Sequence, residues 1–182
     1  MISDYLKQST RPLHDQTEAK FNSEKIFAGT FTFEDYLKLL RYNYVFLLNY
    51  ESAVFDAISA KNAALIHLPK RKKLPLLENE WNALNLDPLD PDFLPTVKNE
   101  AEAFGILYVM EGSTLGGNMI AKQLSKRQDF AKANFEYFRV YGEHTGSFWK
   151  NFKTVLDHEI VGDKKEDCVL GANKAYQFLL HL

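Results

Sequence analysis

The feature that most restricts the fold is a helix-like segment with three closely spaced glycines. It runs from Leu107 to Ile120, starts and ends with good helix formers, and has Gly112, Gly116 and Gly117 at its centre. Each glycine in a helix interior costs about 0.5–1 kcal/mol relative to alanine, so we expect the helix to bend or to unwind locally. Two explanations stay open at this point: glycine lets a second helix pack closely, or it lets a large flat ligand lie against the backbone.

Length and composition predict a single domain, 1–182, with a substantial apolar core, because 46% of the residues are hydrophobic. The net charge of −2 gives no general attraction to nucleic acid or to an anionic membrane, and we expect neither partner. Cys168 is the only cysteine, which excludes an internal disulfide and a cysteine-based metal cluster. Residues 1–7 do not resemble a signal peptide, and no apolar run approaches the roughly 20 residues of a membrane span. We therefore expect a soluble, cytoplasmic protein.

Apolar residues recur at helical spacing along nearly the whole chain, which predicts an all-α, single-domain helical bundle with a glycine-kinked helix. Pro12 predicts that the first helix restarts near Ser9-Thr10, and Thr32 with Asp35 has the spacing of a capping box. The expected helices are 3–21, 33–59, 74–84, one from Thr96 or Val97 to about 126, 145–158, and one that follows Gly162-Asp163 and runs to about 180. We expect a basic linker at 66–73, a proline-rich connection at 87–95 and an aromatic, extended segment at 135–141.

The histidines are the main candidates for chemistry. His67 lies in the basic linker, a structural role is the expectation for His158 and His181 near helix ends, and a capping or surface role is the expectation for His144. His14 differs because helical spacing places it with Leu13, Thr17 and Phe21, facing inward, although a satisfied core histidine would show the same pattern.

Several motif classes are absent from the sequence. No Glu-x-x-His pair of a ferritin-like di-iron site, no His-Glu-x-x-His, no P-loop and no Gly-x-Ser-x-Gly elbow occurs. What remains is an inward histidine, the glycine helix, and the cations Lys7 and Arg11 one turn apart before His14. A heme would use all three, as axial ligand, close backbone contact and propionate partners, although an ordinary solvated face explains the two cations equally well.

Two segments have a pattern known from one protein family: Leu6-Lys7-x-x-Thr10-x-x-Leu13-His14-x-x-x-Glu18, and Gly105-x-Leu107-Tyr108-Val109-x-Glu111-Gly112-Ser113-Thr114-Leu115-Gly116-Gly117. In these segments the chain resembles the bacterial, biliverdin-producing branch of the heme oxygenase family. Weaker support comes from Arg71-x-x-Leu74-Pro75-x-Leu77, from Tyr141-Gly142 and from Phe148-Trp149-x-x-Phe152. The run Glu-Gly-Ser-Thr-Leu-Gly-Gly, with a histidine about a hundred residues upstream, is the specific part of the signal.

The resemblance implies roles for individual residues. It makes His14 the axial ligand of the heme iron and places Glu18 near that ring. It makes Gly112, Gly116 and Gly117 the bent helix over the other heme face, with Ser113, Gly112 and Gly116 as catalytic positions. Lys7 and Arg11 match positions where basic side chains meet propionates, and Lys150 falls where arginine is common.

Two positions depart from the family pattern. Ser113 stands where many members have aspartate, and a hydroxyl cannot supply a carboxylate's charge. Lys150 cannot imitate a bidentate arginine, which could loosen the orientation of the heme.

The implied function is oxidative cleavage of heme at a meso carbon to biliverdin, iron and carbon monoxide. Heme is then both cofactor and substrate, molecular oxygen is consumed, and electrons come from an external reductase or ferredoxin. A bilin acceptor such as a phytochrome is one destination of the product, and release of iron is another purpose. Two alternatives stay open: a heme-binding or heme-sequestering protein without turnover, and a helical scaffold for another flat ligand.

Overall fold

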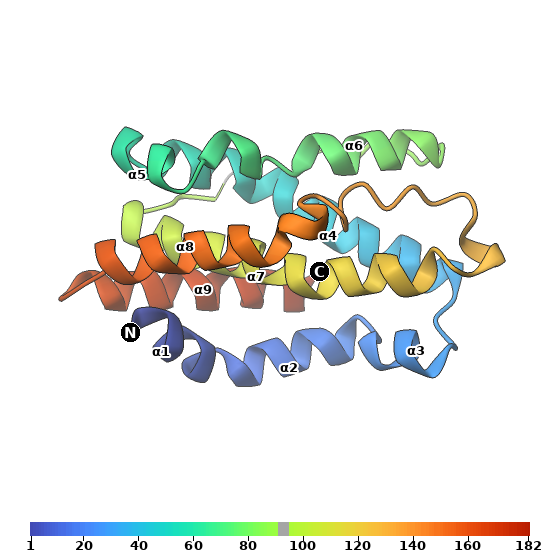
Figure 1. The fold of residues 1–182 in the computed structure, drawn as a ribbon, viewed down its shortest axis with the longest axis horizontal. Coiled ribbons are helices and arrows are strands. Elements are labelled where there is room, and N and C mark those ends of the chain that lie inside the picture. Colours follow the sequence, from blue (N-terminus) through green and yellow to red (C-terminus); the bar gives the residue numbers. More distant parts are fainter. Residues whose placement is uncertain (91–94) are drawn as a thin grey trace.

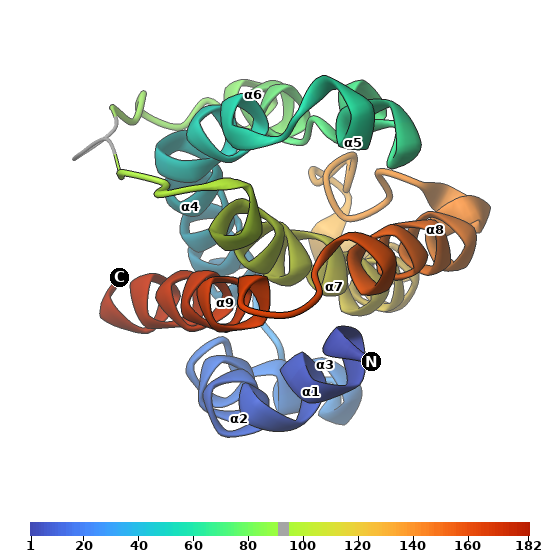
Figure 2. The same cartoon turned by 90° about the vertical axis from the view of Figure 1, so that its left-hand side faces the viewer.

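The structure, a computed structural model, describes residues 1–90 and 95–182, and within these ranges it contains helices and turns but no strand. The chain forms α1 (Ile2–Ser9), α2 (Arg11–Lys20), α3 (Ser23–Ala28), α4 (Phe33–Ala57), α5 (Ala60–Leu65), η1 (Leu68–Arg71), α6 (Leu74–Ala83), α7 (Glu100–Leu124), η2 (Gln128–Phe130), η3 (Gly142–His144), α8 (Thr145–Glu159) and α9 (Lys164–His181). The predicted all-α class is confirmed. Figures 1 and 2 show α1–α3 on one side of a central group formed by α4, α7, α8 and α9, with α5 and α6 on the opposite side.

Local sequence signals explain where the helices begin. Thr32 and Asp35 form the predicted capping box of α4, in which each side chain accepts a hydrogen bond from the other residue's backbone N–H. Pro12 lies in the first turn of α2, where proline removes no helical hydrogen bond, so the predicted restart after Ser9 is confirmed.

Glycines set the closest helix packing, between α7 and α9. A Cβ on Gly105 would lie 1.9 Å from the carbonyl oxygen of Cys168, and one on Gly171 would lie 2.1 Å from that of Glu102. Both distances are far below van der Waals contact, so only glycine lets the two backbones approach this closely. Close helix packing therefore occurs on this chain, but at positions other than the three central glycines of α7.

Two sequence predictions differ from the structure, and two short helices were not predicted. α7 is α-helical without a break from Glu100 to Leu124, so its glycines do not unwind it. Residues 135–141 form successive turns instead of an extended segment, with the Arg139 N–H bonded to the Phe135 carbonyl at 3.0 Å. The short helices α3 and α5 were not predicted, because six residues are too few to show a helical period. Of the connection predicted at 87–95, residues 91–94 lie outside the described residues.

No helix among the described residues is both long enough and apolar enough to cross a membrane.

A histidine-lined pocket as the candidate functional site

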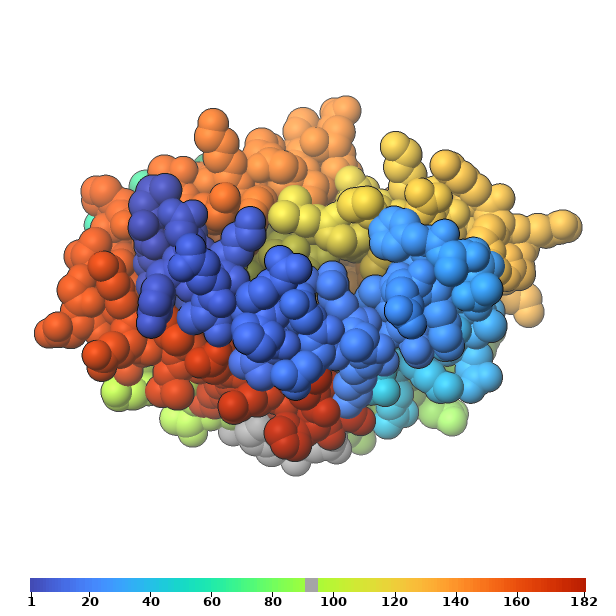
Figure 3. Space-filling model, turned by 90° about the horizontal axis from the view of Figure 1, so that it is seen from below, coloured from blue at the N-terminus to red at the C-terminus, as the bar shows by residue number. Residues whose placement is uncertain are grey.

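A cavity with a volume of about 510 Å³ lies between the N-terminal helices and α7. That volume is typical of pockets for cofactors and small molecules, which measure roughly 300–1,000 Å³. α1 and α2 form one wall and α7 the facing wall, while Phe21, the start of α3, α4, α8, α9 and residues 137–138 complete the lining. Figure 3 shows this face of the molecule hollowed between the N-terminal helices and α7. Segments a hundred residues apart in the sequence thus enclose one space.

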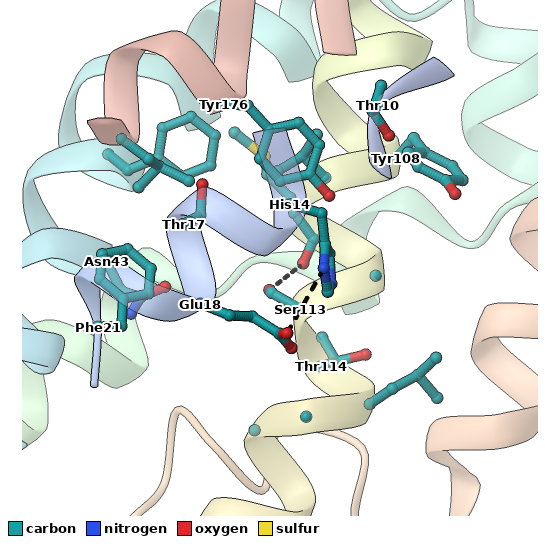
Figure 4. A pocket seen from close by; sticks show the side chains of 18 of the residues that line it. Thr10, His14, Thr17, Glu18, Phe21, Asn43, Tyr108, Ser113, Thr114 and Tyr176 are labelled. Atoms are coloured by element: carbon teal, nitrogen blue, oxygen red, sulfur yellow. Dashed lines mark hydrogen bonds and ion pairs between the residues drawn. The ribbon is translucent and has the colours of Figure 1, made fainter. Parts of the chain in front are cut away.

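His14 projects from α2 into this pocket (Figure 4). Its side chain is 45% exposed, so the predicted inward orientation is toward the pocket and not into the apolar core. The Nδ1 atom lies 3.8 Å from a Glu18 carboxylate oxygen and 3.5 Å from an Asp15 oxygen. Two neighbouring carboxylates favour a proton on Nδ1, which leaves the Nε2 lone pair available as a ligand. The Tyr176 ring meets the imidazole edge-on, with ring centroids 6.2 Å apart.

Three lysine and arginine side chains line the pocket, and they are not the expected three. Lys7 and Arg11 line it as predicted, whereas Lys150 is exposed and does not; Lys153, nearly one turn further along α8, takes that place. Arg11 is paired with Asp15 at 2.8 Å, while Lys7 forms no ion pair with any described residue. Lys153 lines the pocket in place of Lys150 for a simple reason. Residues three apart on a helix point in directions that differ by about 60°, and the rotation of α8 about its axis cannot be read from the sequence.

The three central glycines of α7 lie on the pocket wall for different reasons. A Cβ on Gly116 would meet no atom within 4 Å, and one on Gly112 would meet only the Trp149 ring, at 3.7 Å. A Cβ on Gly117 would lie 3.3 Å from the Phe138 ring, which is tight packing. Tight packing against Phe138, which lies in a turn, therefore explains Gly117 but leaves Gly112 and Gly116 without a packing reason.

Ser113 lies on the same wall, and its hydroxyl donates to the Met110 carbonyl at 2.9 Å. A hydroxyl can exchange this local bond for one to a pocket ligand by rotating about a single torsion. The predicted site residues His14, Lys7, Arg11, Glu18, Gly112, Ser113, Gly116 and Gly117 are thus brought together around one cavity, and Lys150 is not.

A buried ion cluster holds α7 on the side away from the pocket. It consists of Arg71 and Lys73, which pair with the two carboxylate oxygens of Glu111, and of Tyr141, which donates to the same carboxylate at 2.9 Å. The Arg71 and Glu111 side chains are 0% and 1% exposed. Burial, with the neighbouring Glu111 charge, raises the pKa of Tyr141 and keeps it a neutral donor.

This buried ion cluster fixes the residue directly before Gly112, and sequence reasoning missed it. Its members lie within segments that carried the family resemblance, yet the sequence alone could not show that those segments meet. Removing one member of this cluster would strongly lower the stability of the fold, because it would leave a buried ion without its partner.

Asn43 and Tyr137 were also missed. Both are buried, both line the pocket, and the Tyr137 hydroxyl donates to Asn43 Oδ1 at 2.8 Å. An asparagine in the middle of an apolar helix was the available signal, since a buried amide needs partners.

Fold and pocket together define the class: an all-α protein whose histidine and cations face a glycine-containing helix across an apolar cavity. The family model for heme oxygenase matches residues 93–182, which contain that helix, while His14 lies before the matched range. A heme oxygenase of Xanthomonas campestris pv. campestris (strain 8004) is 33% identical over 107 residues, or 58% of this chain. The aligned region covers 64% of that relative's length. Over these two regions the chain is similar to heme oxygenases.

Proposed function

We propose that this protein is a heme oxygenase that cleaves heme at a meso carbon to biliverdin, iron and carbon monoxide. The observation that carries the proposal is the pair of facing walls in one cavity. A histidine lies on one wall, and on the other a helix presents Gly112 and Gly116, for which packing gives no reason. Removal of two side chains in this way leaves room for a flat ring system close to the helix backbone.

The residues present suit a heme. His14 would ligate the iron through Nε2, with Glu18 and Asp15 holding the proton on Nδ1. Lys7 and Arg11, at the same wall, would bind the two propionates, and Lys7 is available because no described acidic residue pairs with it. The apolar remainder of the lining would bury the ring. Bound heme supplies both the iron that takes up oxygen and the carbon that is oxidised.

The chain's own contribution would be to bind, orient and shield. Gly112 and Gly116 would bring the α7 backbone close to the ring and so limit the space on that face. The Ser113 hydroxyl would hold a water beside it as a source of protons. His14, a neutral nitrogen ligand, would leave the iron less electron-rich than a cysteine thiolate would.

The proposed reaction also leads to proposals about the compartment, the electron donor and the use of the products. We propose a single domain over 1–182 that works in the cytoplasm, consumes molecular oxygen and accepts electrons from a separate reductase or ferredoxin. The bilin product would pass to an acceptor such as a phytochrome, or the iron would be the useful product. We leave Lys150 out of the proposed heme contacts and assign its role to Lys153, because Lys153 lines the cavity and Lys150 does not.

The test begins with an anaerobic hemin titration followed by absorption, and then oxygen and ascorbate or ferredoxin are added. We expect a sharp Soret band that decays into a biliverdin spectrum. His14→Ala should lose the axial-ligand spectrum and turnover, whereas His158→Ala, an exposed histidine paired with Glu159, should change neither. Unchanged turnover in His14→Ala would refute the assignment of the ligand.

A second candidate function is heme binding without turnover. It is favoured by one observation: Ser113 places no carboxylate on the α7 wall, and its hydroxyl is bonded back to the helix. A Soret band that stays stable with several electron donors would support this candidate. Absence of any Soret band would contradict both functions.

A further inference from the structure

The inner wall of the pocket carries a small polar pair in apolar surroundings. Asn43 of α4 and Tyr137, from the turns that follow η2, are 9% and 7% exposed and both line the cavity. Their neighbours in the lining from α4 are Leu39, Phe46 and Leu47. Burying a polar group in an apolar site costs free energy unless the group is hydrogen-bonded. The presence of this pair in a ligand pocket therefore calls for an explanation.

The hydrogen bonds of this pair fix the orientation of the Asn43 amide. Tyr137 donates its only hydroxyl hydrogen to Oδ1 at 2.8 Å, and Nδ2 donates to the Leu39 carbonyl oxygen at 2.8 Å. A flipped amide would direct its oxygen at that carbonyl, where neither atom has a hydrogen to donate. The amide is therefore locked, and the second Nδ2 hydrogen meets no acceptor among the described residues.

Ser113 completes the group from the α7 side. Ser113 lines the same cavity as Asn43 and Tyr137, and its hydroxyl can rotate away from the Met110 carbonyl toward a ligand held there. Figure 4 shows Asn43 and Ser113 among the side chains that line the pocket. The set offers an amide hydrogen, a rotatable hydroxyl and the lone pairs of a phenol oxygen. A water or small ligand held inside a protein needs about two to four such partners.

We propose that Asn43, oriented by Tyr137 and assisted by Ser113, is a hydrogen-bond donor to the outer atom of a small ligand or water held in the pocket. Asn43 makes the contact, and Tyr137 is a positioning residue that acts through it. The three groups carry no charge, so the site selects small molecules with a lone-pair acceptor and does not depend on a carboxylate on α7. This inference rests on the proposed function, because it needs a metal centre in the pocket to which the small ligand is attached.

The test uses ferric, hemin-loaded protein titrated with azide, followed by absorption. Asn43→Leu keeps the size of the side chain and removes its donor. We expect azide affinity to fall about tenfold, since a hydrogen bond to a charged group contributes roughly 1.5–3 kcal/mol and 1.4 kcal/mol is a factor of ten. Tyr137→Phe should cause a smaller loss. The double variant should bind azide no more weakly than Asn43→Leu alone, because Tyr137 acts through Asn43.

Two measurements separate hydrogen bonding from packing. Carbon monoxide affinity of the ferrous protein should stay unchanged in both single variants, because an uncharged ligand gains little from the donor. Tyr44→Phe is the matched control: it is a buried tyrosine next to Asn43 on α4, packs on Trp81 and does not line the cavity, so its azide affinity should equal that of the wild type.

The outcomes distinguish this inference from the function beneath it. Hemin-loaded variants that bind azide as the wild type does would overturn the role of Asn43 and leave the heme assignment intact. Equal losses of azide and carbon monoxide affinity would also overturn it, because altered access would explain both. A wild-type protein without a Soret band would overturn the proposed function and this inference together. Tyr137→Phe, which removes a single oxygen, keeps the test decisive if Asn43→Leu does not fold.

Discussion

Gly116→Ala should stabilise the heme-free protein while weakening its hold on heme. Gly116 lies in the interior of α7, and a Cβ there would meet no atom within 4 Å, so the methyl group costs nothing in packing. Alanine is the better helix former, because glycine loses more backbone freedom when it becomes helical. In the heme complex, however, the same methyl would lie between the helix backbone and the ring.

The size of both effects can be estimated. Alanine in place of an interior helical glycine gains up to about 1 kcal/mol, which raises the melting temperature of a domain of this size by about 2–4 °C. Forcing an added carbon into a filled contact costs about 1–3 kcal/mol, which corresponds to a loss of roughly five- to 150-fold in hemin affinity. The two measurements should therefore move in opposite directions.

Gly105→Ala is the matched comparison on the same helix. Its Cβ would lie 1.9 Å from the Cys168 carbonyl oxygen, whereas ordinary contact begins at 3.4 Å, so α7 and α9 would have to separate by about 1.5 Å (3.4 − 1.9). This overpacking costs about 3 kcal/mol or more and exceeds the gain of about 1 kcal/mol in helix propensity. The net loss of about 2 kcal/mol should lower the melting temperature by about 4–8 °C.

Circular dichroism melts of the heme-free variants and hemin titrations by absorption provide the assay. A Gly116→Ala protein that melts below the wild type would refute the prediction, because the helix would then have a packing reason for glycine. A Gly116→Ala protein that binds hemin and turns it over as the wild type does would also refute it. Gly116→Val, with a larger side chain, should block heme binding or oxygen access, and a fully active Gly116→Val protein would count equally against the backbone contact.

Three other changes test neighbouring features. Glu111→Gln should cost about 3–5 kcal/mol in urea unfolding, because it leaves the two cations of the buried ion cluster without a counter-charge; a loss below about 1 kcal/mol would show that water reaches the cluster. The Lys61 ammonium is the main cause that lowers the pKa of Glu159 from 4.5 to about 2, so the stability advantage of the wild type over Glu159→Gln should be complete above pH 4.5 and disappear as the pH falls toward 2. An advantage that instead grows in acid would refute that assignment. Lys7→Gln should weaken hemin binding roughly two- to fivefold, as expected for one exposed ion pair, whereas Lys150→Gln should leave it unchanged. Equal effects of the two lysine variants in the hemin titration would contradict the placement of the propionates.

The sequence by itself determined the helical class and most of the pocket's first wall. Apolar spacing, the Thr32–Asp35 capping box and Pro12 act within one or two helical turns, so the sequence shows them directly. Helical spacing over the same short range predicts that Lys7, Arg11 and His14 lie on one side of the N-terminal helices. The three glycines of α7 were also visible in the sequence, because glycine is unusual inside a helical segment.

Only the tertiary structure decided how those elements face one another. Helical periodicity groups residues on a face, but it does not say which helix meets that face or how far each helix is rotated. The close packing of α7 on α9 at Gly105, the contact between Asn43 and Tyr137, and the exchange of Lys150 for Lys153 all depend on that rotation. Each joins segments far apart in the chain, and no local preference along the sequence records such a pairing.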